Sequence, residues 1–598
     1  MTERPTAGSR AGWLGRLRAV SPSVRNETAR TDAESVTERS EELGKAEESC
    51  ARAGAVEILL VFAGCLAATL AALAWSGQRR AMLWFGDAEA HLHIARRLFD
   101  SHRPGVAQLG SVWLPLPHLL LAPLVALDGW WRSGFAGAIP SGIEFVLADV
   151  GLYWLARRWL SVSASVVTLL LIAANANLLY LSTTAMTEPL FVAELIGSVV
   201  LLVEWRAAVA AQSDRRAGWL LWLLTGVLVA AVATRYDGWI LGFAVWCSMA
   251  VLLGRRGLLI RAQFISASVV LLMAPLAWMA YNKLVFRDAL DFMRGPYSAR
   301  AIELRTAQGV FPPHPGWHDP WVALLFFGKA AEMVAAVGWM GQLLMVVSLG
   351  GAVLMWRTRR LHTARWTLLL WLPLPFYCYS VAYGSVPIFL PVWWPHSWYN
   401  MRYGLELLPA LALFAGFAAE ALLRMVRRWR PMIAGVVAWL LIAGAGANAV
   451  WVMRHDPVVI AEARSNHEAR WAYEYQIATR LGFLHRRAPK AMVLMDTSSY
   501  PQIIPDAGLT YRQTLNESDK RFYTEALRAP AQHADIALAF ADDRVESAIK
   551  VHASDYQALW TFEGLGQPKA TIYVSDTLMK KLQIPGFDAR VAGDRIAP

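Results

Sequence analysis

The sequence predicts an all-α polytopic membrane domain followed by a soluble α/β domain at the C-terminal end. Three observations carry this prediction. Of the 598 residues, 56% are hydrophobic and only 17% are charged, an apolar excess that is typical of integral membrane proteins. Apolar runs of about 20 residues, the length that crosses a bilayer, recur along residues 55–453. From residue 454 onward, short apolar runs alternate with polar stretches.

The charge distribution indicates which partners to expect. The net charge of +11 would suit nucleic acid or an anionic membrane face. The arginines lie in short clusters between apolar segments, so the sequence predicts a lipid bilayer as partner and no nucleic acid. The four cysteines are scattered, which predicts neither a disulfide framework nor a metal site.

The first 54 residues are rich in Ser, Thr, Arg and Glu and show no apolar periodicity. We therefore expect residues 1–54 to form a disordered cytoplasmic tail. The run from Ala55 to Trp75 is long enough to span a bilayer, which distinguishes it from the shorter apolar core of a signal peptide.

Arginine placement predicts the orientation of the spans. We expect about eleven spans, which begin near Ala55, Ala138, Val162, Glu188, Ala217, Gly238, Ala262, Val334, Trp366, Tyr403 and Met432. With a cytoplasmic N-terminus, every second short connection should be basic. The basic connections contain Arg157 and Arg158, then Arg206, Arg215 and Arg216, then Arg255, Arg256 and Arg261, then Arg357, Arg359, Arg360 and Arg365, then Arg424, Arg427, Arg428 and Arg430. The connections between them are nearly free of Lys and Arg, which is the alternation that the rule requires.

The same alternation decides whether the segment from Val112 to Leu127 spans the membrane. This segment is apolar but interrupted by three prolines. If this segment spanned the membrane, all later basic clusters would face outward. We therefore expect a re-entrant or juxtamembrane segment on the outer side. The stretch Trp84–Ala122, the turns at 186–188 and 235–237, the long loop Asn282–Glu332 and the C-terminal region should then share the extracytoplasmic side.

Residues 454–598 are predicted to form the extracytoplasmic α/β domain. The strand-like runs are Ala491–Met495, Ile536–Phe540, Ala558–Phe562 and Thr571–Val574, and the helical stretches include Asp519–Leu527 and Asp543–Val551. The domain has no glycine-rich phosphate loop, Cys/His cluster or nucleophile elbow. We expect it to be a lid or docking surface without a catalytic role.

Ionisable residues crowd the beginning of the first outer segment. Asp87 and His91 are four apart and share a helix face, whereas Glu89 and His93 point elsewhere. Asp87 suits a helix N-cap as well as a catalytic role, and both interpretations stay open. Because His91 and His93 diverge on a helix and no third ligand has suitable spacing, the pattern predicts no metal site.

Several later outer segments carry further candidates. Glu188 begins a span, where a carboxylate also favours the helix dipole. Arg235 and Arg402 are cations among outer loops that are otherwise poor in them, so they could bind an anionic phosphate, although Arg235 could instead pair with Asp237. The neighbouring aromatic residues Tyr236 and Tyr403 suit either a binding site or an interfacial belt, and Arg294 and Tyr297 lie in a loop that we expect to cover substrate.

Five segments together resemble a known superfamily. They are GDAEAHLHIARRL, the proline-broken LPLPHLL, MTEPLF, RYDGW and MRYGLELLPALALFAG. In this order they resemble the GT-C superfamily of membrane glycosyltransferases, in particular bacterial relatives of the protein O-mannosyltransferases and the lipid A aminoarabinose transferases. The resemblance covers residues 55–453 and implies a GT-C domain in a bacterial inner membrane.

The resemblance also implies roles for individual residues. Asp87 matches the catalytic acidic residue of the first outer loop, and Glu188 matches the acidic residue of the second. Arg235 and Arg402, with Tyr236 and Tyr403, occupy places near the phosphate of the lipid donor. His118 lies where the aminoarabinose transferases have a Lys-Pro-Pro motif, which this chain lacks. The supporting residues would be Glu89, His91, His118, Asp237, Arg294 and Tyr297.

The sequence therefore predicts transfer of a hexosyl or pentosyl group from a polyprenyl-phosphate-linked donor to an acceptor hydroxyl, with inversion and an Asp general base. Phosphate is a good leaving group, so no second carboxyl is needed as general acid. Some superfamily members use a divalent metal, and the acceptor, whether lipid, polysaccharide or protein, is left open. The alternatives are a transporter or flippase for a lipid-linked precursor, and an assembly scaffold dominated by the C-terminal domain.

Overall fold

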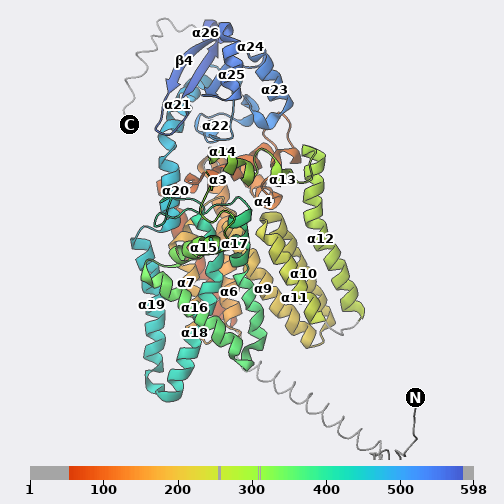
Figure 1. Ribbon diagram of the computed structural model, residues 1–598, viewed down its shortest axis with the longest axis vertical. Coiled ribbons are helices and arrows are strands. Elements are labelled where there is room, and N and C mark those ends of the chain that lie inside the picture. Colours follow the sequence, from red (N-terminus) through yellow and green to blue (C-terminus); the bar gives the residue numbers. More distant parts are fainter. Residues whose placement is uncertain (1–52, 254–257, 308, 310, 583–598) are drawn as a thin grey trace, which may run out of the picture. The chain divides into compact units, whose positions relative to one another are not determined.

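The computed structural model describes residues 53–253, 258–307, 309 and 311–582. The predicted tail, residues 1–54, lies outside this part of the chain except for its last two residues. Seven helical segments in the described part are long and apolar enough to cross a membrane. They are α2 (Ala55–Arg79), α6 (Phe135–Ala156), α10 (Asp214–Thr234), α12 (Leu258–Phe286), α16 (Trp339–Arg357), η4 with α18 (Met401–Leu407 and Leu408–Trp429), and the segment from Pro431 to Glu468 that contains α19 (Ala434–Arg454) and α20 (Val458–Glu468) (Figure 1). The predicted polytopic all-α membrane protein is confirmed.

Helices also occupy the other predicted spans. They are α7 (Val162–Ala173), α9 (Glu188–Ala210), α11 (Asp237–Leu253), and the pair η3 (Arg359–Trp371) and α17 (Pro373–Tyr383). Helix α7 is short because Asn175 caps the next helix, α8 (Ala176–Leu181), by accepting hydrogen bonds from the backbone N–H groups of Asn177 and Leu178.

The proline-broken segment forms α4 (Pro115–Val125) between α3 (Gly86–Arg97) and α5 (Asp128–Ser133). With 11 residues, α4 is too short to cross a hydrocarbon core of about 30 Å at about 1.5 Å per residue. This length agrees with the expected re-entrant or juxtamembrane segment.

The predicted long loop Asn282–Glu332 contains more helix than expected. Helix α12 extends into it, and α13 (Asp291–Arg294), α14 (Ala299–Thr306) and α15 (Pro320–Ala335) follow. Helix α15 begins with Pro320 at its first position. The side chain of the preceding Asp319 accepts hydrogen bonds from the backbone N–H groups of Trp321 and Val322. The span that was expected to begin near Val334 begins at Trp339, the first residue of α16, because α15 ends at Ala335.

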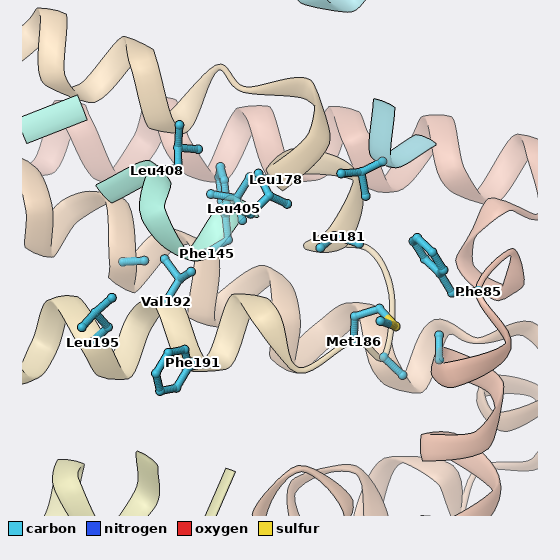
Figure 2. Close-up of a cluster of buried hydrophobic side chains, with 14 of the residues drawn as sticks. Phe85, Phe145, Leu178, Leu181, Met186, Phe191, Val192, Leu195, Leu405 and Leu408 are labelled. Carbon is cyan, nitrogen blue, oxygen red and sulfur yellow. The ribbon is translucent and has the colours of Figure 1, made fainter. Parts of the chain in front are cut away.

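The membrane helices pack closely around a common core. A Cβ atom at Gly351 of α16 would lie 1.9 Å from the carbonyl oxygen of Phe414 in α18, so only glycine permits this approach. Figure 2 shows the buried side chains of Phe145, Leu178, Phe191 and Leu405, which come from α6, α8, α9 and η4. This core fixes the starts of α9 and η4, where the polar residues described below lie.

A five-stranded mixed sheet follows α21 (Trp471–Arg487). Its order is β2–β1–β3–β5–β4, with β1 parallel to β2 and β3, and β5 antiparallel to β3 and β4. The bounds are β1 (Val493–Met495), β2 (Thr514–Leu515), β3 (Ile536–Phe540), β4 (Tyr556–Phe562) and β5 (Ala570–Ser575). The shorter helices are α22 (Ile503–Asp506), α23 (Arg521–Arg528), α24 (Pro530–His533), α25 (Arg544–Val551) and α26 (Asp576–Leu582).

Both faces of the central strand β3 are buried. Its alternate residues Ile536 and Leu538 join the cluster that contains α21, whereas Ala537 and Ala539 join the cluster that contains α23 and α25. A sheet covered by helices on both faces is an α/β arrangement, which confirms the predicted class of the C-terminal region.

Candidate active site

The turn between α10 and α11 holds Arg235 and Asp237 in place. A Cβ atom at Gly238 would lie 2.0 Å from the carbonyl oxygen of Ala231, so the glycine of the RYDGW segment allows α11 to begin directly against the end of α10. The guanidinium of Arg235 then lies inside the protein, with its side chain 15% exposed.

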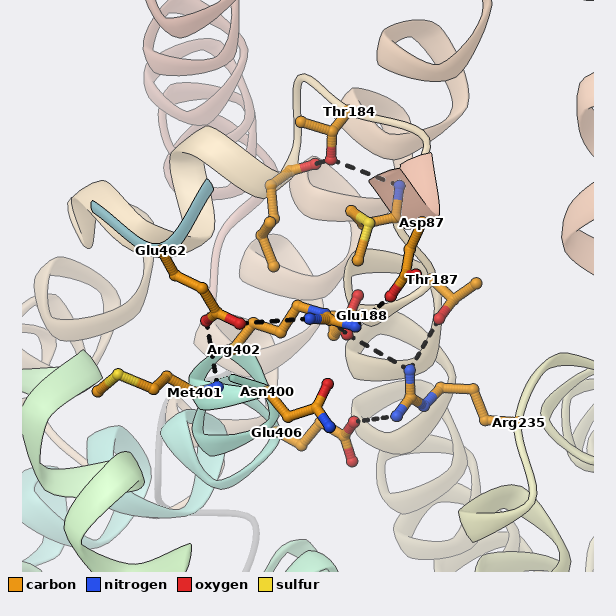
Figure 3. Close-up of polar contacts among 12 residues, drawn as sticks. Asp87, Thr184, Thr187, Glu188, Arg235, Asn400, Met401, Arg402, Glu406 and Glu462 are labelled. Carbon is orange, nitrogen blue, oxygen red and sulfur yellow. Dashed lines mark hydrogen bonds and ion pairs between the residues drawn. The ribbon is translucent and has the colours of Figure 1, made fainter. Parts of the chain in front are cut away.

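Arg402, at the start of η4, gathers three carboxyl groups from distant segments (Figure 3). Its Nη2 donates to Asp87 of α3, its Nε donates to Oε1 of Glu188 at 3.0 Å, and its Nη1 lies 3.5 Å from Oε1 of Glu462 in α20. The Arg402 side chain is only 6% exposed. Three of its five N–H groups therefore point to carboxylates, which is an unusually acidic environment for one guanidinium.

Arg235 makes a second set of contacts beside the first. Its Nε donates to Asp237 at 3.2 Å, its Nη2 lies 3.1 Å from Glu406, and its Nη1 lies 3.5 Å from the same Glu188 oxygen that Arg402 contacts. The hydroxyl of Tyr377 also accepts from Arg235 and donates to Glu406 at 2.7 Å. Glu188 Oε1 thus joins the two arginines into one network.

The network holds five carboxyl groups and two guanidinium groups. Glu188 is fully buried, and its Oε2 has no hydrogen-bond partner among the described residues. Asp87 differs from the other four because its side chain is 43% exposed. It is therefore the carboxyl group of this network that a substrate can reach.

The ring of Tyr403 packs under both arginines. The guanidinium carbons of Arg235 and Arg402 lie 5.1 Å and 5.0 Å from its centroid, within the range of a cation–π contact. Tyr377 stacks on Tyr403 with centroids 5.1 Å apart. The aromatic rings thus fill the space around the guanidinium planes.

His91 lies one helical turn after Asp87 and pairs with His118 of α4. Its Nδ1 is 2.9 Å from Nε2 of His118, whose own Nδ1 is 3.1 Å from the carbonyl oxygen of Leu114. A carbonyl oxygen only accepts, so Nδ1 of His118 carries the proton when both rings are neutral. Nε2 of His118 then accepts a hydrogen bond from Nδ1 of His91, and Nε2 of His91 keeps its lone pair. Burial and the guanidinium groups of Arg235 and Arg402 lower the pKa of His91 to about 3, which keeps the ring neutral.

The other predicted residues lie outside the arginine network. Tyr236 donates to the carbonyl oxygen of Val112 at 2.7 Å and stacks on Phe292. Arg294 pairs with Asp288 at 2.8 Å on the exposed loop, and Tyr297 is 42% exposed.

Glu89 faces the C-terminal region instead. Its Oε2 lies 2.5 Å from Nη1 of Arg470, which also lies 3.1 Å from Glu474. Burial raises the pKa of Glu89 to about 8, although Arg470 opposes this shift. His93 packs between the rings of Trp131 and Tyr511.

Sequence reasoning did not find Glu406, Glu462 or Tyr377. Glu406 lies four positions after Arg402 in an otherwise apolar span. A carboxyl group in such a span is a signal that could have identified it. Glu462 lies in the region to which no chemical role was given, and nothing in its local pattern distinguishes it.

The described residues hold no group of three or more His, Cys, Asp and Glu side chains arranged to bind a metal ion. The carboxyl groups that could serve as ligands point toward guanidinium groups instead. The donor set therefore does not fit the divalent metal of some superfamily members, and the mechanism below has no step that uses one.

No family model matches the chain, and no curated protein matches it. Among solved structures, it is similar to ArnT from Cupriavidus metallidurans bound to undecaprenyl phosphate, with a TM-score of 0.50, 13% identity, and coverage of 87% of this chain and 98% of that chain. The apo state of that ArnT gives 0.48, with 13% identity and coverage of 84% and 97%. The apo oligosaccharyltransferase of Archaeoglobus fulgidus gives 0.39, with 11% identity and coverage of 81% and 69%.

The protein is thus a multi-pass membrane protein. The likeness to the ArnT structure at a TM-score of 0.50 shows that its fold is of the GT-C type, the fold that the five sequence segments predicted.

Proposed function

We propose that the protein is a membrane glycosyltransferase that moves a sugar from a polyprenyl-phosphate-linked donor to an acceptor hydroxyl on the extracytoplasmic face, with inversion. The observation that carries the proposal is the contact between the accessible carboxylate of Asp87 and the buried guanidinium of Arg402. The solved ArnT structure of the same fold was obtained with undecaprenyl phosphate bound, which supports a donor of this chemical class.

The contacts of Arg402 suggest how a phosphate would bind. Three carboxyl groups occupy its Nε, Nη1 and Nη2 atoms, so a phosphate can bind this guanidinium only if one of them gives way. Asp87 is the one that is exposed, and it occupies Nη2 of Arg402. We infer that the donor phosphate takes the place of Asp87 on Arg402, so donor binding frees the carboxylate to act as a base.

The transfer then needs one base and one cation. The acceptor oxygen forms a bond to the anomeric carbon while the bond from that carbon to the phosphate oxygen breaks, and the electron pair stays on the phosphate. Asp87 takes the proton of the acceptor hydroxyl. Arg402 neutralises the charge that develops on the leaving phosphate.

Two further groups have positioning or contact roles. Glu188, which the resemblance makes catalytic, is fully buried between both arginines, so we propose that it positions their guanidinium groups. The Nε2 lone pair of His91 accepts a hydrogen bond from a second hydroxyl group of the acceptor, so the attacking hydroxyl keeps its own proton for Asp87.

The first test uses Asp87→Asn in purified protein with a synthetic polyprenyl-phosphate sugar and a membrane extract as acceptor source. We expect loss of sugar transfer by at least about 100-fold, because the amide cannot accept the proton. Release of polyprenyl phosphate is the measurement. The exposed Asp555 provides the matched control Asp555→Asn, which should transfer normally.

Full transfer by Asp87→Asn, with unfolding like that of the wild type, would reject Asp87 as the base. Absence of transfer by the wild type with every donor sugar would reject the glycosyltransferase proposal.

One observation favours a second candidate function, flipping of a lipid-linked precursor. Glu144 and Asp149 of α6 and Glu194 of α9 are buried inside helices of the membrane region, and both carboxyl oxygens of Asp149 have no hydrogen-bond partner in the described part of the chain. Ionisable groups at such positions often mark transport paths. Movement of a fluorescent polyprenyl-phosphate sugar across a vesicle membrane without cleavage would favour this candidate.

A further inference from the structure

A cavity of about 370 Å³ lies between α20 and the loops of the C-terminal sheet. Its wall includes Glu462, Ser465 and Asn466 of α20, Trp398 from the loop before η4, and Tyr500 and Gln567 from the loops after β1 and β4. The volume falls in the range of ligand sites, which is about 300–1,000 Å³.

The cavity is adjacent to the arginine network. Glu462 belongs to both, because its Oε1 lies 3.5 Å from Arg402 and its Oε2 accepts from the backbone N–H of Met401 at 3.1 Å. Trp84, three positions before Asp87, stacks on His467 of α20 with centroids 6.1 Å apart. Asp87 does not line the cavity, but Arg402 contacts both Asp87 and the cavity residue Glu462.

The lining combines aromatic rings with neutral polar groups. Trp398 and Tyr500 offer rings, while Ser465 and Asn466 are exposed and make no side-chain hydrogen bond within the described residues. Tyr500 donates to the amide oxygen of Gln567 at 2.7 Å, which holds both side chains in place. Aromatic faces and amide or hydroxyl groups together suit the apolar faces and hydroxyl groups of a sugar ring.

The charges in the wall argue against an anionic ligand. The one cationic side chain of the wall, Arg470, contacts Glu89 and Glu474 through Nη1, whereas its Nε and Nη2 are buried without a hydrogen-bond partner among the described residues. Glu462 adds a third carboxyl group beside this single cation. The excess of carboxyl groups disfavours a phosphate or carboxylate in the cavity. The polar lining equally disfavours an acyl chain.

We propose that this cavity binds the acceptor and that the acceptor is a neutral saccharide. This inference rests on the proposed glycosyl transfer and adds the class of the acceptor to it. The saccharide lies between Trp398 and Tyr500 and directs one hydroxyl group toward Asp87.

The test measures binding without catalysis. The full-length protein in nanodiscs, without donor, is irradiated with diazirine-bearing disaccharides of glucose, galactose, mannose and N-acetylglucosamine, and the labelled peptides are identified by mass spectrometry. We expect at least one disaccharide to label residues 462–470 or 498–501. Labelling should fall at least fivefold in Asn466→Ala and in Trp398→Phe.

The controls are an exposed amide of the C-terminal region, Gln532→Ala, and an exposed tryptophan of α19, Trp439→Phe. Both should be labelled like the wild type. Asp87→Asn should also keep the label, which separates binding from transfer.

Three outcomes would overturn the inference. They are labelling confined to other segments, no labelling by any disaccharide, and labelling of the cavity by a diazirine-bearing serine peptide alone. Labelling of the cavity in a protein that transfers no sugar would leave the saccharide site standing and reject the glycosyltransferase proposal. Transfer to a saccharide without labelling of the cavity would support the glycosyltransferase proposal and reject the saccharide site.

Discussion

At the scale of single residues, Arg402 connects groups that the chain keeps far apart. It contacts Asp87, which lies 315 positions earlier, together with Glu188 and Glu462. Buried ion pairs of this kind contribute little net stability when complete, but removal of one partner leaves uncompensated charge. The arginine is therefore important for folding as well as for the proposed chemistry.

Replacement of Arg402 separates these two roles. We expect Arg402→Leu to lower the free energy of unfolding by about 3–5 kcal/mol, because buried carboxyl groups lose their partner. Arg402→Lys should fold more stably than the leucine variant but transfer poorly, since a compact ammonium lacks the planar fork with which the guanidinium reaches carboxyl groups on different sides. Unfolding in a denaturing detergent and release of polyprenyl phosphate are the two measurements.

The matched control is Arg521→Leu, because Arg521 forms an exposed pair with Glu525. Exposed pairs are worth at most about 1 kcal/mol, so this variant should unfold almost like the wild type. Equal unfolding of Arg402→Leu and Arg521→Leu would contradict the buried network.

The histidine pair supplies a second test at this scale. His118→Leu removes the acceptor of His91 Nδ1, so the proton can move to Nε2 and block the lone pair that we assign to a second hydroxyl group of the acceptor. We expect kcat to fall at least about tenfold with little change in the KM for the donor. His118→Gln keeps an acceptor oxygen and should retain most of the activity; an equal loss in both variants would argue against control of the tautomer.

The sequence predicted part of this site. Asp87, Glu188, Arg235 and Arg402 stand in segments that resemble GT-C motifs, and the structure brings all four into one network. Glu462 could not be predicted, because a single carboxyl group on a short helix has no periodic signature and its partner is 60 positions away.

At the scale of elements, the prediction succeeded where the pattern is local. The run Ile536–Phe540 has the same bounds as β3, because five apolar residues between polar turns define a buried strand. Strand β2 has only two residues, too few for any alternation, and was not predicted. Helix α15 lies in the predicted loop because its 16 residues are fewer than the length expected for a span, although Asp319 and Pro320 form a local start signal.

The contact between α3 and α21 gives a prediction about pH. Burial raises the pKa of Glu89 from 4.5 to about 8 in the folded protein, and Glu474 and Asp506 add to the shift. The folded protein therefore holds a proton that the unfolded chain releases, so this stability is complete below about pH 4.5 and is lost as the pH rises toward 8.

We expect the apparent Tm of the wild type to fall between pH 6 and 8, with a contribution from Glu89 of at most about 1.4 kcal/mol per pH unit. Glu89→Gln should flatten this part of the profile, because the amide does not titrate. Glu563→Gln, at a carboxyl group that is 77% exposed, is the control and should keep the wild-type slope. A profile that Glu89→Gln leaves unchanged would refute the role of this carboxyl group.

At the scale of the whole molecule, contacts fix which segments share one side of the membrane. Arg132 of α5 donates to the carbonyl oxygens of Pro505 at 2.5 Å and Leu509 at 3.1 Å. The first outer segment and the C-terminal region must therefore lie on the same side. The arginine clusters predict that this is the extracytoplasmic side.

The orientation can be measured with single cysteines in a variant whose four native cysteines are replaced by serine. We expect Ser133→Cys in α5 and Ser554→Cys near β4 to react with a membrane-impermeant maleimide in intact cells. Ser213→Cys, which lies beside Arg215 and Arg216 between α9 and α10, should react only after permeabilisation. All three serines are exposed, so a difference in labelling reports the side of the membrane rather than burial. The opposite pattern would reverse the orientation and place the accessible carboxylate of Asp87 in the cytoplasm, whereas different labelling of Ser133→Cys and Ser554→Cys would contradict the contact through Arg132.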